Sequence, residues 1–419
     1  MHNLFLLIIG ILIPSIVYSF EFPVFPWNYT GFQRFPSFYF GGNEDGPQSK
    51  AELEILSRFA MVGWGWQQSF NTNHSQHGEN NGANAAIALR TLSPVSPGNL
   101  STPDALFVYR QSESLFTYYD LMAQIAANAS EKNLSVVTDP VTGAQCGGGG
   151  LLGYKNIFFQ HYWSQVIGTE INNEVYVNAV FLDGFDKLYA GNTLQSQGCP
   201  NFNTQATAEE LLHKVTAQGQ QLEILSGANK VAIVSTYNFL SNSSNFLNTL
   251  TEEEKEYAIN HNVSLNVQNM NGVTEDVYVS AWSGEGMNNV NSSTKGLWIR
   301  FYEVWMGHGY VQDSIMLRNA ILEVQQGVPF IARTQIGTVK TLEYPAAAFL
   351  IAQGPFCYWG ASSGWVDADW SWKGEYDWNV GSPLGPAIEV NTFIWTRAFT
   401  KANVTVNLKT ATGNIYFAE

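Results

Sequence analysis

Cysteine is scarce in this chain, and its scarcity limits the class of protein. The 419 residues include only three cysteines, Cys146, Cys199 and Cys357. A chain of this length can bury its own hydrophobic core, so it is not a small scaffold held together by disulfides. No spacing of cysteine and histidine matches a zinc site. Cys146 and Cys199 lie in predicted loops on either side of a strand that ends at Asp183, and we expect them to pair. We expect Cys357 to be a buried free thiol inside an apolar strand.

Basic residues are also scarce. Lys and Arg number 20 against 35 Asp and Glu, which gives a formal net charge of -15. Nucleic acids and anionic membrane surfaces attract the opposite sign of charge, so neither is expected as a partner. Aromatic residues are plentiful, with 13 Trp, 19 Tyr and 26 Phe. Most of them should fill the core, and rings beyond that need could line a cleft where the apolar faces of sugars stack.

Long hydrophobic runs are absent after the N-terminus. An apolar run spans Leu4 to Val17, and the following Val17-Tyr-Ser19 suits cleavage by signal peptidase after Ser19. Residues 1–19 are therefore predicted to be a signal peptide, with a retained signal anchor as the alternative. No later segment has the length and purity of a transmembrane helix, so no membrane span is predicted once the signal is removed.

Asn-X-Ser/Thr triplets support export from the cell, because such triplets accept N-linked glycans in secreted proteins. They begin at Asn28, Asn73, Asn99, Asn128, Asn133, Asn242, Asn262, Asn291 and Asn403. In a chain rich in asparagine some triplets arise by chance, so several are expected to stay unmodified. We predict a secreted, extracellular glycoprotein.

Eight short apolar runs are typical of strands, and amphipathic stretches separate several of them. The predicted strands are Phe38–Phe40, Met61–Trp64, Ala105–Tyr109, Val175–Asp183, Val231–Thr236, Asp276–Glu285, Pro329–Arg333 and Ala348–Ala352. The predicted helices cover residues 50–58, 114–127, 207–225 and 312–326.

Apolar strands that alternate with helices indicate a parallel sheet covered on both faces. Eight such units predict an α/β protein with a (β/α)₈ TIM barrel that carries long loop insertions, here over residues 20–370. A doubly wound open sheet is the alternative, although no G-x-G-x-x-G loop follows the first strand. Residues 371–419 contain short strands near 393–395, 404–406 and 415–417, and they predict a small C-terminal β elaboration packed on the barrel.

Two of the predicted strands end in an acid beside glycine. Asp183 precedes Gly184, and Glu285 follows Gly284. Because the carboxyl ends of barrel strands meet at one face, two such acids predict the paired carboxylates of a glycosidase. Asp183 is the expected nucleophile or base. Glu285 is the expected general acid, since burial beside Trp282 would raise its pKa. The simpler interpretation is that both acids cap helices, as we expect for Asp186.

Other side chains at the predicted strand ends are candidates for substrate binding, because that face carries the active site of such barrels. They are Asn43, Trp64, Tyr109, Arg110, Asn238, Trp282, Arg333, Gln335 and Tyr358. Arg110 and Arg333 could instead form structural ion pairs with Glu44 or Asp183.

Several motifs resemble a known family. The strand Phe181-Leu-Asp-Gly184, the later strand near Glu285, and the C-terminal motifs Glu375-Tyr-Asp, Pro383-Leu-Gly, Arg397-Ala-Phe and Val404-Thr-Val-Asn resemble the hypothetical glycosyl hydrolase family fifteen. That group is similar to the endo-polygalactosaminidase and α-galactosidase-like barrels. The resemblance covers most of the mature chain and implies a (β/α)₈ barrel with glycosidase chemistry. It implies no particular substrate, and the long insert from Gln67 to Pro103 departs from a minimal barrel.

We therefore predict a secreted glycoside hydrolase that cleaves O-glycosidic bonds of a polysaccharide or glycan with two carboxylates and no cofactor or metal. A non-catalytic carbohydrate-binding or structural extracellular glycoprotein is the first alternative. A hydrolase with a metal held by Asp183, Asp186 and Glu285 is the second.

Overall fold

The protein was described from a computed structural model. The structure describes residues 25–42, 47–65, 68, 78–92, 103–111, 138–146, 171, 174–183, 199–201, 225, 227–228, 230–235, 250–260, 298–325, 327–365 and 369–418. The predicted signal peptide lies outside these residues, as do nearly all of the predicted helices at 114–127 and 207–225.

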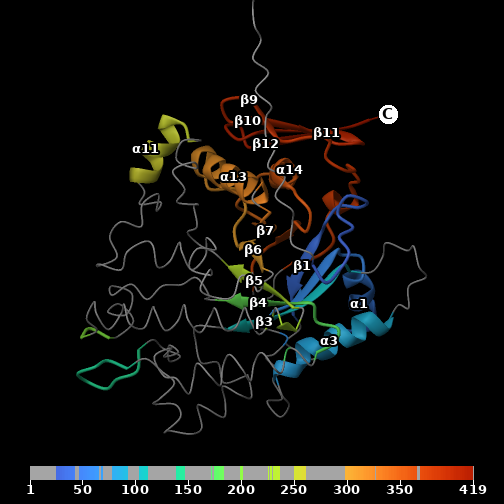
Figure 1. Ribbon diagram of the computed structural model, residues 1–419, viewed down its shortest axis with the longest axis vertical. Helices are drawn as coiled ribbons and strands as arrows, with labels where there is room; N and C mark the ends of the chain where they lie inside the picture. Colours follow the sequence, from blue (N-terminus) through green and yellow to red (C-terminus); the bar gives the residue numbers. More distant parts are fainter. Residues whose placement is uncertain are drawn as a thin grey trace, which may run out of the picture.

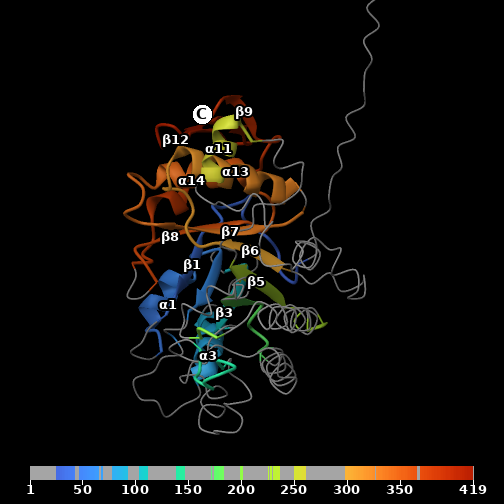
Figure 2. The same ribbon diagram turned by 90° about the vertical axis from the view of Figure 1, so that its left-hand side faces the viewer.

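Eight parallel strands form one sheet in which every strand pairs with its neighbours in chain order (Figures 1 and 2). They are β1 (Phe38–Gly41), β2 (Met61–Trp64), β3 (Ala105–Gln111), β4 (Ala179–Asp183), β5 (Val231–Ser235), β6 (Trp298–Tyr302), β7 (Phe330–Gln335) and β8 (Tyr358–Ser362). The amide of Trp359 donates to the carbonyl of Pro36 at 2.9 Å, and Ser37 forms a parallel bridge with Trp359. These contacts join the last strand to the first, so the sheet closes into the predicted (β/α)₈ barrel.

Two of the eight predicted strands are wrong. The sixth strand of the barrel is Trp298–Tyr302 and not the segment 276–285, because β6 is the strand that pairs with both β5 and β7. The segment 276–285 itself lies outside the described residues. The predicted eighth strand, Ala348–Ala352, is the end of a helix, and the eighth strand comes after it at Tyr358–Ser362. Cys357 is a buried free thiol as expected, but it precedes β8.

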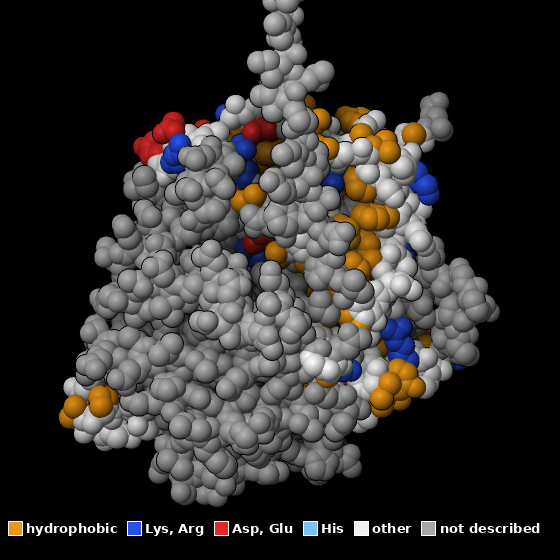
Figure 3. Space-filling view, in the orientation of Figure 1, with side chains coloured by type: hydrophobic (Ala, Val, Ile, Leu, Met, Phe, Trp, Pro, Cys, Tyr) orange, Lys and Arg blue, Asp and Glu red, His pale blue; other side chains and the backbone are white. Residues whose placement is uncertain are grey.

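The described helices are α1 (Lys50–Leu56), α3 (Gly78–Leu92), α11 (Glu252–Asn260), α13 (Tyr310–Gln325) and α14 (Glu343–Ala352). In α1 the Ser49 side chain accepts from the Glu52 amide, and the Glu52 carboxylate accepts from the Ser49 amide, so a capping box fixes where this helix begins. The helix α3 lies inside the long insert predicted at 67–103. None of the described helices is both long and apolar enough to cross a membrane. In Figure 3 acidic side chains gather over α11, whose first turn holds three glutamates.

The chain ends in a four-stranded antiparallel sheet, which confirms the expected C-terminal β structure. Its strands are β9 (Ile388–Asn391), β10 (Ile394–Ala398), β11 (Ala402–Asn407) and β12 (Thr412–Phe417), in the order β12-β11-β10-β9. Helices α13 and α14 lie between this sheet and the barrel (Figure 2). The Nη1 atom of Arg397 in β10 donates to the carbonyls of Leu350, Ile351 and Gln353 at the end of α14. The sheet is therefore held against the barrel by a cation on unsatisfied helix carbonyls.

Phenylalanine rings fill the interior of the barrel. The ring of Phe181 lies 5.2 Å from that of Phe40 and 5.0 Å from that of Phe301, measured between centroids. Phe38 stacks on Phe107 at 5.7 Å. Glycine makes the space for these rings, because a Cβ at Gly63 of β2 would lie 1.8 Å from the Phe107 ring. The interior of the barrel is thus filled with side chains and is not a pore. We call this layer of rings, Phe38, Phe40, Phe107, Phe181 and Phe301, the phenylalanine floor.

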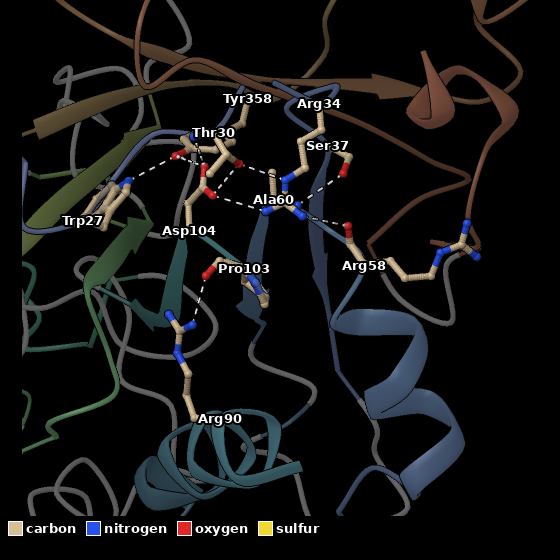
Figure 4. Close-up of polar contacts among 10 residues, drawn as sticks. All are labelled: Trp27, Thr30, Arg34, Ser37, Arg58, Ala60, Arg90, Pro103, Asp104 and Tyr358. Carbon is tan, nitrogen blue, oxygen red and sulfur yellow. Dashed lines mark hydrogen bonds and ion pairs between the residues drawn. The ribbon is translucent and has the colours of Figure 1, made fainter. Parts of the chain in front are cut away.

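The end of the barrel at which the strands begin is closed by the segment before β1 (Figure 4). The side chain of Asp104, directly before β3, is buried and accepts from the amide and hydroxyl of Thr30 at 3.0 and 2.7 Å, and from Arg34 at 3.2 Å. The Tyr358 hydroxyl also donates to Asp104, at 3.3 Å, and accepts from the Trp27 indole at 3.0 Å. Burial raises the pKa of Asp104, and the bonds from Thr30 and the charge of Arg34 oppose that rise.

The predicted disulfide is present. Cys146 and Cys199 are bonded with their Cα atoms 5.5 Å apart, and 53 residues separate them in sequence. Beside the bond, the buried carboxylate of Asp139 accepts from the amides of Val141, Thr142 and Asn201 at 2.9 to 3.0 Å. The disulfide and this carboxylate together hold two segments that are distant in the sequence.

Candidate functional site

Two acids stand at the end of the barrel where the strands finish. Asp183 is the last residue of β4, two positions after Phe181, and Glu303 directly follows β6, two positions after Phe301. Because side chains alternate along a strand, Asp183 points to the same side as Phe181. Glu303 lies in the bend that follows β6, where its charge acts on the Arg333 guanidinium. The two rings touch across the barrel axis at 5.0 Å, so both acids rise from neighbouring parts of one floor. Both are half-buried.

A tyrosine from the neighbouring strand holds the carboxylate of Asp183. The Tyr109 hydroxyl in β3 donates to Asp183 Oδ2 at 2.7 Å. The Tyr109 ring is itself buried and lies 5.8 Å from Phe181 and 6.4 Å from Phe40. The hydrogen bond therefore comes from a donor whose position is fixed by the floor beneath it.

Arg333 of β7 places a cation at this face. Its side chain is buried, with Nε donating to Ser362 Oγ at 2.8 Å and Nη1 donating to the main-chain oxygen of Glu303 at 2.9 Å. Burial lowers the pKa of Arg333 to about 10, while attraction to Glu303 opposes that fall. At neutral pH the guanidinium stays charged beside Glu303.

The loop after Glu303 is held in an uncommon conformation. Met306 is buried with φ at 65°, a region that non-glycine residues seldom adopt. The buried carboxylate of Asp313 accepts from the amides of Gly307 and His308 at 3.0 Å and from the Tyr344 hydroxyl at 2.7 Å. These bonds fix the chain that leaves β6 and so restrict where Glu303 can lie.

The structure places three predicted substrate-binding residues away from this face. Trp64 is buried on the outside of the barrel, where its Cβ lies 3.8 Å from the position of a Cβ at Gly82 in α3. Arg110 follows the inward Tyr109, so it points outward, and it forms a buried ion pair with Glu174 at 4.0 Å. Tyr358 begins β8 and belongs to the Asp104 cluster at the opposite end (Figure 4).

The other predicted site residues divide into two groups. Gln335 lies on the same side of β7 as Arg333 and is half-buried at the end of the strand. Asn43, Asn238, Trp282 and Glu285 lie outside the described residues, so their roles stay predictions. In the part of the chain that the structure describes, no group of three or more His, Cys, Asp and Glu could hold a metal ion.

Sequence reasoning missed three residues of this face: Glu303, Ser362 and Trp365. Trp365 lies three residues after β8, and its ring centroid lies 5.6 Å from Phe40 and 6.0 Å from Phe301. The signal for Glu303 was present, because the aromatic and β-branched run Trp298–Tyr302 ends directly at this acid.

Several solved structures are similar to this chain at low identity. An α-galactosidase from Lactobacillus brevis is 9% identical with a TM-score of 0.31, over 48% of this chain and 27% of that chain. An exo-β-N-acetylglucosaminidase from Vibrio harveyi, in complex with N-acetylglucosamine, is 10% identical with a TM-score of 0.35, over 72% of this chain and 41% of that chain. A double mutant of the endo-β-1,4-mannanase from Cellulomonas fimi is 9% identical with a TM-score of 0.37, over 90% and 82%. The chain thus spans less than half the length of the first two.

A comparison with curated proteins found no matching sequence. The family model described as hypothetical glycosyl hydrolase family 15 matches residues 151–403, which is more than half of the chain. The match includes β4 to β8, β9, β10 and the start of β11, and it confirms the resemblance seen in the sequence motifs. This chain therefore belongs to the hypothetical glycosyl hydrolase family 15.

Proposed function

We propose that this protein is a secreted glycoside hydrolase that works with two carboxylates, Asp183 and Glu303. The observation that carries the proposal is the placement of both acids one step above the touching rings of Phe181 and Phe301. Adjacent strands lie about 4.8 Å apart, so β4 and β6, separated by one strand, are roughly 10 Å apart along the sheet. Their side chains converge toward the axis, which suits the pair separations of about 5 to 9.5 Å that glycosidases use.

The surroundings suggest different tasks for the two acids. The Tyr109 hydroxyl orients Asp183 Oδ2 and provides a donor for its negative charge, as a nucleophile or base requires. Glu303 then protonates the leaving oxygen. Arg333 donates to the main-chain oxygen of Glu303 and so helps to fix the position of this residue. Glu285 is the rival for the proton donor.

The Asp183→Asn variant tests the proposal. Wild-type protein is incubated with mannan, galactan, chitin and cellulose, and new reducing ends are measured. The variant is expected to lose about 10³-fold or more of the hydrolysis rate on any glycan that responds, because the first step needs this carboxylate. The exposed Asp377, at the opposite end of the barrel, gives the control variant Asp377→Asn, which should keep the wild-type rate. Hydrolysis by Asp183→Asn at the wild-type rate would refute the assignment.

Export is part of the proposal. It is supported by the apolar N-terminal run and by the disulfide, which is typical of oxidising compartments. Among the nine sequon asparagines, Asn28 and Asn403 lie in the described residues, and both are exposed. When the chain is expressed in a eukaryotic secretory host, mass spectrometry of the medium should find a protein that begins at Phe20. Release of N-glycans should lower its mass, and retention of the whole chain in cells would count against export.

A further inference from the structure

The indole of Trp365 is a second feature of the candidate site. It leaves the end of β8 and folds back over the barrel axis, where its ring meets Phe40 of β1 at an interplanar angle of 79° and lies near Phe301 of β6 at 49°. The residue as a whole is half-buried. Because Phe301 also lies beneath Glu303, the indole forms a wall beside that acid.

Arg333 holds this wall in place. Its Cζ atom lies 3.9 Å from the centroid of the Trp365 ring, so a guanidinium covers one face of the indole. The same guanidinium is bonded to Ser362 and to the main chain of Glu303. The indole and the acid therefore share two neighbours, Phe301 and Arg333, and their relative position is fixed from both.

We propose that Trp365 is the stacking platform of the sugar subsite next to the scissile bond, and that it accepts a neutral pyranose ring. This inference rests on the proposed function. The CH groups on one face of a pyranose form an apolar surface, and a rigid aromatic ring is the matching partner. The phenylalanine floor lies buried below the acids, and among the described residues Trp365 is the half-buried ring that contacts this floor at the height of Glu303.

The same molecule contains a matched control. Arg58 lies over the ring of Trp372 at 3.9 Å, which repeats the Arg333–Trp365 stack. Trp372 is also half-buried and packs on Phe59, just before β2, and on Tyr376. This second stack lies where the strands begin and is far from the two acids. A purely structural role of an Arg–Trp stack would therefore appear equally in both.

The experiment measures binding to the full-length Asp183→Asn protein by isothermal titration calorimetry. The probes are cellotetraose, mannotetraose, tetra-N-acetylchitotetraose and β-1,4-galactotetraose. At least one should bind, and adding Trp365→Ala should weaken it by roughly tenfold or more, the effect of losing one aromatic stacking partner. Trp365→Phe should recover part of the affinity. Adding Trp372→Ala instead should change the affinity by less than about twofold, although the melting temperature should fall about as much as with Trp365→Ala.

Two results would overturn the inference. One is that Trp365→Ala changes the affinity for none of the four tetrasaccharides. Absence of binding to both proteins counts as this result. The other is equal weakening by Trp365→Ala and Trp372→Ala, which would show a structural effect. Failure of the proposed function would look different, because the wild-type protein would then hydrolyse none of the four polysaccharides, or Asp183→Asn would hydrolyse one of them at the wild-type rate.

Discussion

Replacing Glu303 with glutamine is expected to lower kcat about 10²- to 10⁴-fold on a glycan with an ordinary sugar leaving group, the usual contribution of a general acid. The same variant should cleave a 2,4-dinitrophenyl glycoside of the same sugar with a kcat/KM close to the wild-type value. A dinitrophenolate leaves without being protonated, so the missing proton donor has little effect. Asp183→Asn should lose activity on both substrates, because attack on the sugar is needed in either case.

This pair of substrates also separates Glu303 from Glu285. Glu285→Gln, made in parallel, should keep activity on both substrates if Glu303 is the proton donor. Glu256→Gln in α11 is the control, since Glu256 is exposed and belongs to a helix outside the barrel. If Glu285→Gln shows the selective loss and Glu303→Gln does not, Glu285 is the acid. If Glu303→Gln loses activity equally on both substrates, the tasks of Glu303 and Asp183 are exchanged.

The largest effect on stability is expected at the opposite end of the barrel. Asp104→Ala should lower the free energy of unfolding by about 3–5 kcal/mol, because it leaves Arg34 without its carboxylate in a partly buried site. It also removes the acceptor of the Thr30 amide and hydroxyl. The segment that closes the barrel would lose its main polar anchor. Urea unfolding followed by circular dichroism measures the change, and a loss below about 1 kcal/mol would show that the apolar contacts suffice.

The pH dependence of Asp104 has a defined sign. Its pKa is raised in the folded state, mainly by burial, so the folded protein keeps this proton to a higher pH than the unfolded chain does. The resulting stabilisation is complete below the ordinary pKa of aspartate and is lost as the pH rises through the raised pKa. Wild type should therefore lose stability relative to Asp104→Asn over that range. The opposite slope would mean that Arg34 and Thr30 outweigh burial.

The sequence alone determined the class of fold and one half of the candidate site. Short apolar runs separated by helical stretches are specific enough to predict a parallel barrel, since few architectures bury so many strands on both faces. The pairing of Cys146 with Cys199 followed from their places around β4. The candidate role of Asp183 followed from its position, because it ends an apolar, buried strand and is followed by a glycine.

Tertiary contacts decided the remaining elements and site residues, because they stabilise structures that the local sequence pattern does not predict. The helix α14 is buried on every side between barrel and C-terminal sheet, so it has no polar face and resembles a strand. The strand β6 contains Arg300, and a charged residue is unusual in a buried strand. Its charge is compensated by an ion pair with Glu323 of α13. Because β6 was not predicted, Glu303 at its end was not identified as a candidate. The placement of Trp365 depends on rings from β1 and β6, and only the closed barrel brings them together.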